Sequence, residues 1–447
     1  MPKNYSAICT ARAAAGLSVK IKAKELSLAA ETLMITELLG KSMEELRAFC
    51  VALGEPAFRG AQIYHALYAE RKFDVLQITN LPAALRERLA REARVTLPQV
   101  KQRFASSDGS VRYLFGLGAA EKDKEFRAEN RTSREKDQEE TAGQLQKAAS
   151  VEAVYMPSEG RQTICISTQA GCAVDCHFCL TAQLGLIRNL TAGEILGQVL
   201  LPLEEANREA RNEKKEAGLK PAPRKSGVAP PFAAPVEAQG KQGQQTNIVL
   251  MGQGEPLLNF RAVMAAVRIM LDPAGLGISP KHVTLSTSGI VPGIERLAQE
   301  KVRPKLAISL NASNDQQRDA LMPINKKYPI AALINACKEY PLRTWEHLTI
   351  EYVMLGGIND AAEDARRVVR LLSPLKSVKV NLIPWNPGEL PYQESAPERI
   401  AEFRRILVER GVPAFVRYSR GRDVMAACGQ LALLQIDGVP MSVASPD

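Results

Sequence analysis

The feature that most constrains this chain is an alternation of strand-like and helix-like runs across its second half. The strand-like runs are short and apolar, and they cover residues 163–168, 247–251, 282–286, 305–310, 348–354, 378–384 and 414–418. The helix-like runs between them cover residues 192–203, 261–271, 330–340, 361–372 and 399–409. Such alternation favours an α/β fold with a parallel sheet, either doubly wound or curled into a barrel. In both architectures, reactive side chains gather at the carboxyl ends of the strands.

Length and composition allow one large core and a smaller accessory domain. The chain has 447 residues, of which 45% are hydrophobic, and no run approaches the eighteen apolar residues that a membrane span needs. The first fifteen residues lack the continuous apolar region of a secretion signal, so we expect a cytoplasmic protein with no membrane partner. The net charge of +9 fits a polyanionic partner, although charge alone does not identify nucleic acid binding.

Changes in composition along the chain predict five segments. They are a loose extension (1–33), a helical accessory domain (34–118), a charged insertion (119–150), a catalytic core (151–432) with a low-complexity insertion at about 205–245, and a tail (433–447). The accessory domain is predicted from helical spacing after Ser42 and Glu45, which form a capping-box pattern, and a strand-like run from 110 to 117 closes it. Both insertions carry too little apolar content to fold alone.

A cluster of cysteines follows the first strand of the alternating half. Cys172, Cys176 and Cys179 are spaced as C-x3-C-x2-C, directly after Gly171. A single tetrahedral zinc would require a fourth ligand, and His177 lies awkwardly between two of the cysteines. A [4Fe-4S] cluster held by three cysteines instead leaves one iron open to a ligand such as the amino and carboxylate groups of S-adenosylmethionine. We favour the cluster, with a zinc-binding loop as the alternative.

Polar residues stand at the ends of the later strands. Gly254 and Glu255 follow the second strand, where glycine permits close approach of the backbone to a ligand and the carboxylate can pair with an ammonium group. The Gly-Glu-Pro sequence is also compatible with a simple turn before a helix. Ser286, the 309–311 segment and Asn386 are each able to hydrogen-bond a ribose or an adenine.

At this point the sequence resembles one known family, the radical S-adenosylmethionine methyltransferases that methylate carbon 2 of adenine in 23S ribosomal RNA and in certain tRNAs. The resemblance extends from about Met34 to Leu431, apart from the two insertions. The matching segments are 54–63, 79–82, 171–179, 254–259, 381–387 and 426–430. The resemblance implies a partial (β/α)6 barrel related to the TIM barrel, a small amino-terminal helical domain that binds RNA, and a monomer.

The same resemblance implies individual roles. Cys428 matches the cysteine that carries the methyl group, Glu152 matches the base that removes the ring proton, and Cys165 matches the thiol that forms a disulfide with Cys428 to release the product. The positions that match the family's S-adenosylmethionine contacts are Gly254, Glu255, Ser286, Ser309, Leu310, Asn311 and Asn386. The chain departs from the family at Asn311, where a histidine is common, and at Gln253, where a methionine is frequent.

The implied partners are 23S rRNA, tRNA and an electron donor of the flavodoxin or ferredoxin type. Two other functions remain open. One is the related methylation of carbon 8 of the same rRNA adenine, which the amino-terminal segments disfavour. The other is a non-catalytic RNA-binding protein with a zinc loop, which would explain the charge and the clustered cysteines but leaves Glu255 and Cys428 without a role.

Overall fold

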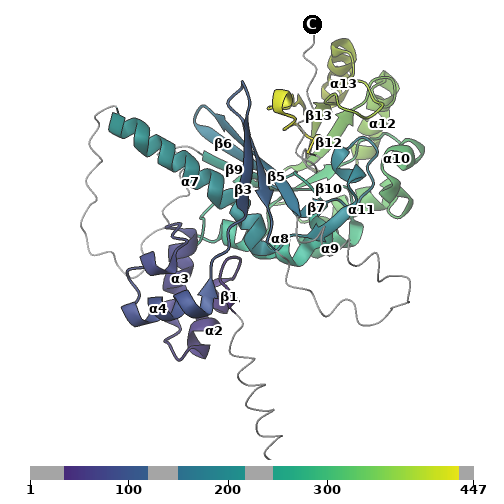
Figure 1. The fold of residues 1–447 in the computed structure, drawn as a ribbon. Coiled ribbons are helices and arrows are strands. Elements are labelled where there is room, and N and C mark those ends of the chain that lie inside the picture. The colour runs from purple at the N-terminus through teal and green to yellow at the C-terminus, as the bar shows by residue number, and fades with distance from the viewer. Residues whose placement is uncertain (1–34, 119–148, 217–244, 432–447) are drawn as a thin grey trace, which may run out of the picture.

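The computed structural model describes residues 35–118, 149–216 and 245–431, and its centre is a single ten-stranded sheet (Figure 1). The strand order is β14-β13-β12-β11-β10-β9-β6-β5-β4-β3. Seven neighbouring strands are parallel: β6 (Arg161–Cys165), β9 (Gln245–Leu250), β10 (Val283–Thr287), β11 (Lys305–Ser309), β12 (Leu348–Met354), β13 (Val378–Pro384) and β14 (Ala414–Val416). These strands coincide with the seven predicted runs to within a few residues.

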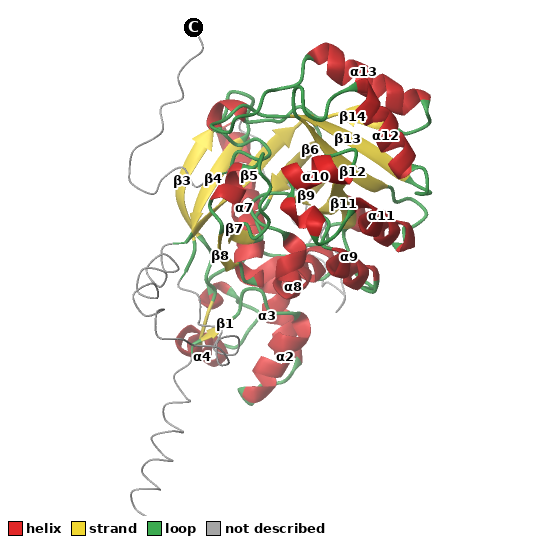
Figure 2. Cartoon of the chain, turned by 90° about the vertical axis from the view of Figure 1, so that its right-hand side faces the viewer, coloured by secondary structure: helices red, strands yellow, loops and turns green. Residues whose placement is uncertain are grey.

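Helices connect the parallel strands and lie around the outside of the curved sheet (Figure 2). The connecting helices are α7 (Ala192–Glu216), α8 (Phe260–Leu271), α9 (Val291–Ala298), α10 (Asp315–Leu321), α11 (Ile330–Glu339), α12 (Ala362–Leu372) and α13 (Pro397–Glu409). Six strand-helix units are therefore followed by the short seventh strand, β14. This arrangement confirms the predicted α/β fold with a partial (β/α)6 barrel.

The core lies between the sheet and these helices. Leu306 and Ile308 on β11 and Ile350 and Tyr352 on β12 are at most 1% exposed. Strands buried on both faces read as almost continuous apolar runs, which is why the sequence revealed them without strict alternation. One charged residue, Glu351, interrupts the apolar run of β12 and is itself buried.

The amino-terminal part is helical, as predicted. It consists of β1 (Thr36–Glu37), α2 (Met43–Ala52), α3 (Phe58–Tyr68), a short 3-10 turn η1 (Val75–Gln77), α4 (Ala83–Glu92) and β2 (Ala93–Arg94). The capping box at the start of α2 is present, because Ser42 Oγ accepts from the Glu45 amide at 3.2 Å and Glu45 Oε2 accepts from the Ser42 amide at 2.7 Å. The Tyr64 hydroxyl on α3 donates to Asp272 at 2.8 Å, which connects the helical part to the end of α8.

The strands that follow this helical part differ from the prediction. We expected the 110–117 strand to close the helical domain. Instead β3 (Gln99–Ala105) and β4 (Val111–Gly116) form an antiparallel hairpin that extends the large sheet through β5 (Ser150–Ser158). Almost every residue of β4 is buried, so this strand needs neighbours on both edges, and β3 and β5 supply them.

Several predicted segments lie outside the described residues: the extension 1–33, nearly all of the charged insertion 119–150, most of the low-complexity insertion, and the tail 433–447. The charged start of the second insertion continues α7 as a helix to Glu216, beyond the predicted helical run 192–203. Among the described helices, none combines the length and the apolar character that crossing a membrane requires.

Candidate active site

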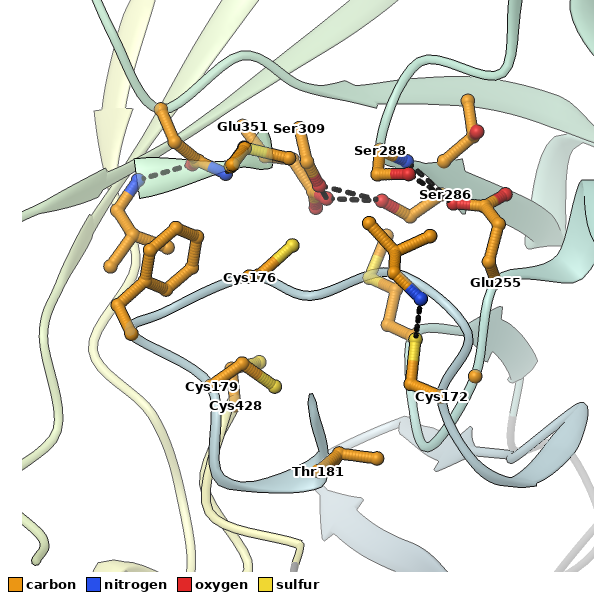
Figure 3. Close-up of a pocket in the computed structure, with 18 of the residues that line it drawn as sticks. Cys172, Cys176, Cys179, Thr181, Glu255, Ser286, Ser288, Ser309, Glu351 and Cys428 are labelled. Atoms are coloured by element: carbon orange, nitrogen blue, oxygen red, sulfur yellow. Dashed lines mark hydrogen bonds between the residues drawn. The ribbon is translucent and has the colours of Figure 1, made fainter. Parts of the chain in front are cut away.

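A cavity of about 170 Å³ lies at the carboxyl ends of the parallel strands (Figure 3). The cysteine loop forms one side, and the ends of β9, β10, β11 and β12 form the other. The predicted site residues that line it are Cys172, Cys176, Cys179, Gly254, Glu255, Ser286, Ser309, Asn311 and Cys428. Residues separated by more than 250 positions in the sequence therefore meet in one cavity.

Backbone geometry fixes the cysteine loop. Strand β7 (Gln169–Gly171) pairs with β8 (Leu186–Asn189), and the loop leaves β7 at Gly171 with a φ of +71°. A Cβ at Gly171 would lie 1.9 Å from the carbonyl oxygen of Gly185, so only glycine fits there. The Cys172 amide donates to the same carbonyl at 2.9 Å, and the Cys179 amide donates to the Cys176 carbonyl at 3.1 Å.

The three thiols of this loop lie in surroundings that oppose a free thiolate. Burial raises the pKa of Cys172 to about 12, and burial also raises the pKa values of Cys176 and Cys179. A metal centre supplies the positive charge that stabilises thiolates in such a place. The loop is therefore suited to a metal-bound state more than to a reactive cysteine.

The donor set fits an iron-sulfur cluster better than a single zinc ion. The cysteine loop supplies three thiols to the cavity. Tetrahedral zinc needs its ligands about 2.0–2.3 Å from one point, whereas an iron-sulfur cluster is bound by thiolates at separate corners. Three cysteines facing one cavity, with a buried carboxylate opposite, match the second arrangement.

Glu255 lies opposite the cysteine loop and is 3% exposed. The amide and the hydroxyl of Ser288 both donate to Glu255 Oε2 at 2.7 Å, and the Leu257 amide donates to Oε1 at 3.1 Å. Burial raises the pKa of Glu255, although these hydrogen bonds oppose the change. Among the described residues no cationic side chain forms a salt bridge with it. The preceding Gly254 has a φ of +95°, and a Cβ there would collide with Gln169.

A second buried carboxylate, Glu351 on β12, was not identified from the sequence. Its Oε2 accepts from Ser286 Oγ at 2.5 Å and from Ser309 Oγ at 3.4 Å, and the two hydroxyls are 3.3 Å apart. Burial raises the pKa of Glu351 as well. The signal that could have revealed it is a carboxylate inside a strand that is otherwise apolar, because a buried charge requires a partner or a function.

Three of the predicted cofactor contacts have roles within the protein. Asn311 has a φ of +56°, and its Oδ1 accepts from the Val353 amide at 2.9 Å, so its side chain joins two strand ends. The Leu310 side chain is buried and does not line the cavity. Asn386 does not line the cavity either. Its Nδ2 donates to the Cys428 carbonyl at 3.2 Å, so it contacts the backbone of the cysteine.

Cys428 lines the cavity and is accessible to solvent. The surrounding protein raises its pKa to about 11, first by desolvation and then through the charge of Glu351. Cys165 is buried in an apolar cluster with Ala426 and Leu431, so it lies beside the segment that carries Cys428. Both cysteines are free thiols in the structure, and the disulfide that the resemblance implies is not formed in it.

Glu152 lies on β5, is fully buried and does not line the cavity. Arg112, which is also buried, donates from Nη1 to Glu152 Oε1 at 2.5 Å, and its guanidinium stacks on the Phe104 ring at 4.0 Å. Gln253 Nε2 donates to the other carboxylate oxygen at 3.3 Å. The sequence did not indicate Arg112, because one arginine in a strand usually lies on the exposed face.

Comparisons with known proteins agree with this cavity. Residues 36–95 match the ribosomal RNA large subunit methyltransferase N-terminal domain, and residues 224–372 match the radical SAM superfamily. A crystal structure of a radical SAM methyltransferase from Sphaerobacter thermophilus superposes with a TM-score of 0.70 at 38% identity, covering 89% of this chain and 99% of that one. The chain is therefore a radical SAM methyltransferase, and its cofactors are a [4Fe-4S] cluster and S-adenosylmethionine.

Curated relatives define the family more closely. A probable dual-specificity RNA methyltransferase RlmN from Koribacter versatilis is 42% identical, over 85% of this chain and 96% of the relative. The dual-specificity RNA methyltransferase RlmN of Anaeromyxobacter dehalogenans is 41% identical, over 89% of this chain and 91% of the relative. This protein belongs to the RlmN family of dual-specificity RNA methyltransferases.

Proposed function

We propose that this enzyme methylates carbon 2 of adenine in 23S rRNA and in tRNA, with Cys428 as the carrier of the methyl group. The observation that carries the proposal is that Cys428 and the three-cysteine loop line the same cavity. An adenine ring carbon is a poor nucleophile, so a radical source and a methyl carrier must lie side by side. The net charge of +9 supports an RNA substrate.

Cys172, Cys176 and Cys179 would hold the cluster, which leaves one iron for S-adenosylmethionine. When bound, the cluster supplies the electron that cleaves S-adenosylmethionine into a radical. The protein's part would be to limit the access of water to this step, since the three cysteines of the loop are only partly exposed. We expect the electron to come from a donor of the flavodoxin or ferredoxin type.

The opposite wall would bind S-adenosylmethionine. Glu255 lacks a cationic partner among the described residues, so its carboxylate is available to the ammonium group of the methionyl end. The hydroxyls of Ser286 and Ser309 are held by Glu351 and face the same cavity, where they would contact the ribose. Asn311 and Asn386 would contribute by shaping the strand ends and the Cys428 segment.

The remaining groups would handle the methyl group and the proton. Cys428 would carry the methyl group as a thioether. Glu152, held by Arg112, would accept the proton that leaves the adenine ring. Cys165 packs against the segment that contains Cys428. Its thiolate would attack the Cys428 sulfur of the methylated adduct, so that an S–S bond forms while the bond from the Cys428 sulfur to the transferred carbon breaks, and the electron pair of that bond leaves with the carbon, which takes up a proton.

The test is methylation by the anaerobically reconstituted full chain with reductant, S-adenosylmethionine, and rRNA and tRNA fragments. We expect 2-methyladenosine by mass spectrometry with the wild type and none with Cys428→Ala or Cys176→Ala. Cys50→Ala, which changes a buried cysteine of α2 remote from the cavity, should retain activity. Full activity of Cys428→Ala would refute the carrier, and 8-methyladenosine as the product would reassign the target carbon.

A further inference from the structure

The segment 419–431, here called the Cys428 segment, is attached to the cysteine loop at its downstream end. The Gly429 carbonyl accepts from the Leu180 amide at 2.8 Å, and the Leu431 carbonyl accepts from Thr181 Oγ1 at 2.6 Å. Both donors directly follow Cys179, the last cysteine of the loop. The downstream end of the Cys428 segment is therefore held in place by the cysteine loop.

The upstream end of the Cys428 segment is attached to a different part of the molecule, the turn between β3 and β4. Asp108 Oδ2 accepts from the Gly421 amide at 3.0 Å and from Arg420 Nε at 3.3 Å. Asp423 Oδ1 accepts from Ser106 Oγ at 2.5 Å, and its Oδ2 accepts from the Ser107 amide at 2.9 Å. We call this set of contacts the hairpin clamp.

Further bonds strengthen the hairpin clamp. The other two nitrogens of the Arg420 guanidinium donate to the carbonyls of Asp108 and Pro157, so the side chain contacts both the β3-β4 turn and the end of β5. Although burial opposes it, the hydrogen bonds that Asp108 accepts from Ser110, Gly421 and Ser106 lower the pKa of its carboxyl. Asp108 therefore stays ionised and paired with Arg420 at neutral pH.

The hairpin clamp joins the two ends of the large sheet. Strand β3 is one edge and β14 the other, and no backbone ladder joins these edges within the described ranges. The clamp residues on the carboxyl side follow β14 directly, and in Figure 1 the yellow segment after β14 lies beside the tips of the amino-terminal strands. Side chains thus bridge the gap that the partial barrel leaves open.

We propose that the hairpin clamp is a positioning device for the reaction: Asp108 and Arg420 hold the Cys428 segment so that the Cys428 sulfur stays directed into the cavity. This inference rests on the proposed role of Cys428. The backbone of the segment is left-handed at Gly421, Met425 and Gly429, and Met425 is the one of these three that is not glycine, so its conformation is the strained one. Positioning of a reacting group to within about 1 Å can be worth about a hundredfold in rate.

The test compares Asp108→Ala and Arg420→Ala in the reconstituted full chain with the wild type and with a control. The control is Arg405→Ala, which removes an exposed arginine that pairs with Glu402 and Glu409 on α13 and is remote from the cavity. We expect kcat to fall about 10- to 100-fold in both clamp variants, with KM for RNA nearly unchanged. Arg420→Lys should restore part of the rate, because it retains the charge but not the branched guanidinium.

A second measurement separates positioning from general loss of structure. Hydrogen exchange of the peptide covering 419–431 should speed up in the clamp variants while exchange in β10, β11 and β12 stays at the wild-type level. If a clamp variant unfolds, Asp423→Asn removes charge from one exposed side chain and serves in its place. Wild-type kcat and wild-type exchange in the clamp variants would overturn the proposal. Absence of any methyl group on Cys428 of the wild type would instead refute the proposed function.

Discussion

The buried carboxylates around the cavity are held in two different ways. Glu152, on the antiparallel side of the sheet, faces the guanidinium of Arg112 at 2.5 Å. Glu255, which follows β9, and Glu351, within β12, accept hydrogen bonds only from hydroxyl and backbone amide groups among the described residues. One carboxylate thus has its counter-charge built into the fold, and two do not.

Under the proposed function, the difference marks the carboxylates whose counter-charge the ligand would supply. Desolvation raises the pKa values of Glu255 and Glu351, because no cation compensates their burial. S-adenosylmethionine carries an ammonium and a sulfonium group, and it would supply the missing positive charge. Glu152 needs no such ligand and can be kept in place for a proton-transfer step. The contrast can be tested by substitutions at Glu152 and its partner and by substitutions at Glu255 and Glu351.

The largest expected effect is on Arg112. Arg112→Met removes the cation that faces Glu152 while keeping an apolar side chain against Phe104. We expect the free energy of unfolding to fall by about 3–5 kcal/mol at pH 7, because a buried carboxylate loses its ionic partner. Urea denaturation of the full chain measures this change.

The matched control for that prediction is Arg112→Met combined with Glu152→Gln. Removing both charges should restore most of the lost stability, since no buried charge then remains at the pair. If the single Arg112→Met variant lost less than about 1 kcal/mol of unfolding free energy, the ion pair of Arg112 and Glu152 would contribute little to stability. The contrast between Glu152 and the two unpaired carboxylates would then have no energetic consequence.

Glu255 should show the next largest effect, on ligand affinity. Glu255→Gln removes the charge and retains one acceptor oxygen, so it can keep the two hydrogen bonds from Ser288 but not the bond from the Leu257 amide as well. We expect S-adenosylmethionine to bind about 10- to 100-fold more weakly, which corresponds to the loss of one charge-assisted hydrogen bond. Anaerobic calorimetry on the cluster-loaded enzyme measures this affinity. Glu402→Gln on the exposed face of α13 is the control, and equal affinity in the two variants would argue against an ammonium contact.

For Glu351 the expected effect is smaller and depends on pH. A carboxyl whose pKa is raised from 4.5 by folding binds its proton more tightly in the native state than in the unfolded chain. The native state then loses stability as the pH rises from about 4.5 through the native pKa. Glu351→Gln should remove part of this decrease, on the order of 1 kcal/mol. Thermal unfolding between pH 4.5 and 8 tests it, and parallel pH profiles of the two proteins would contradict it.

The sequence predicted those parts of this site that depend on local pattern. The C-x3-C-x2-C loop and the Gly254-Glu255 turn directly follow apolar strands, so their placement at the strand ends followed from the alternation alone. Arg112 and Glu351 were missed because their meaning depends on distant partners, 40 and 65 positions away in the sequence.

The same reason explains the expectation that changed. The β3-β4 hairpin pairs with β5, and 33 residues separate the end of β4 at Gly116 from the start of β5 at Ser150, so the local pattern could not show this pairing. Asn386, a predicted cofactor contact, also donates from its amide to the Cys428 carbonyl, a contact spanning 42 residues. Local pattern identified the cysteine loop and the Gly254-Glu255 turn, whereas the roles of Cys428, Cys165 and Glu152 came from the family resemblance.

The smallest expected effect concerns Gln253, which stands where the family frequently has methionine. Its Nε2 donates to Glu152 at 3.3 Å and to the Leu431 carbonyl at 3.5 Å, and both bonds are long. Its Oε1 is buried without a hydrogen-bond partner among the described residues. Gln253→Met therefore removes one unsatisfied acceptor and also the two long hydrogen bonds that Nε2 donates. These changes oppose each other, and we expect stability to change by less than about 1 kcal/mol. If methylation nevertheless fell more than about tenfold, which corresponds to about 1.4 kcal/mol, Gln253 would have to be counted with Arg112 among the groups that hold Glu152 in place.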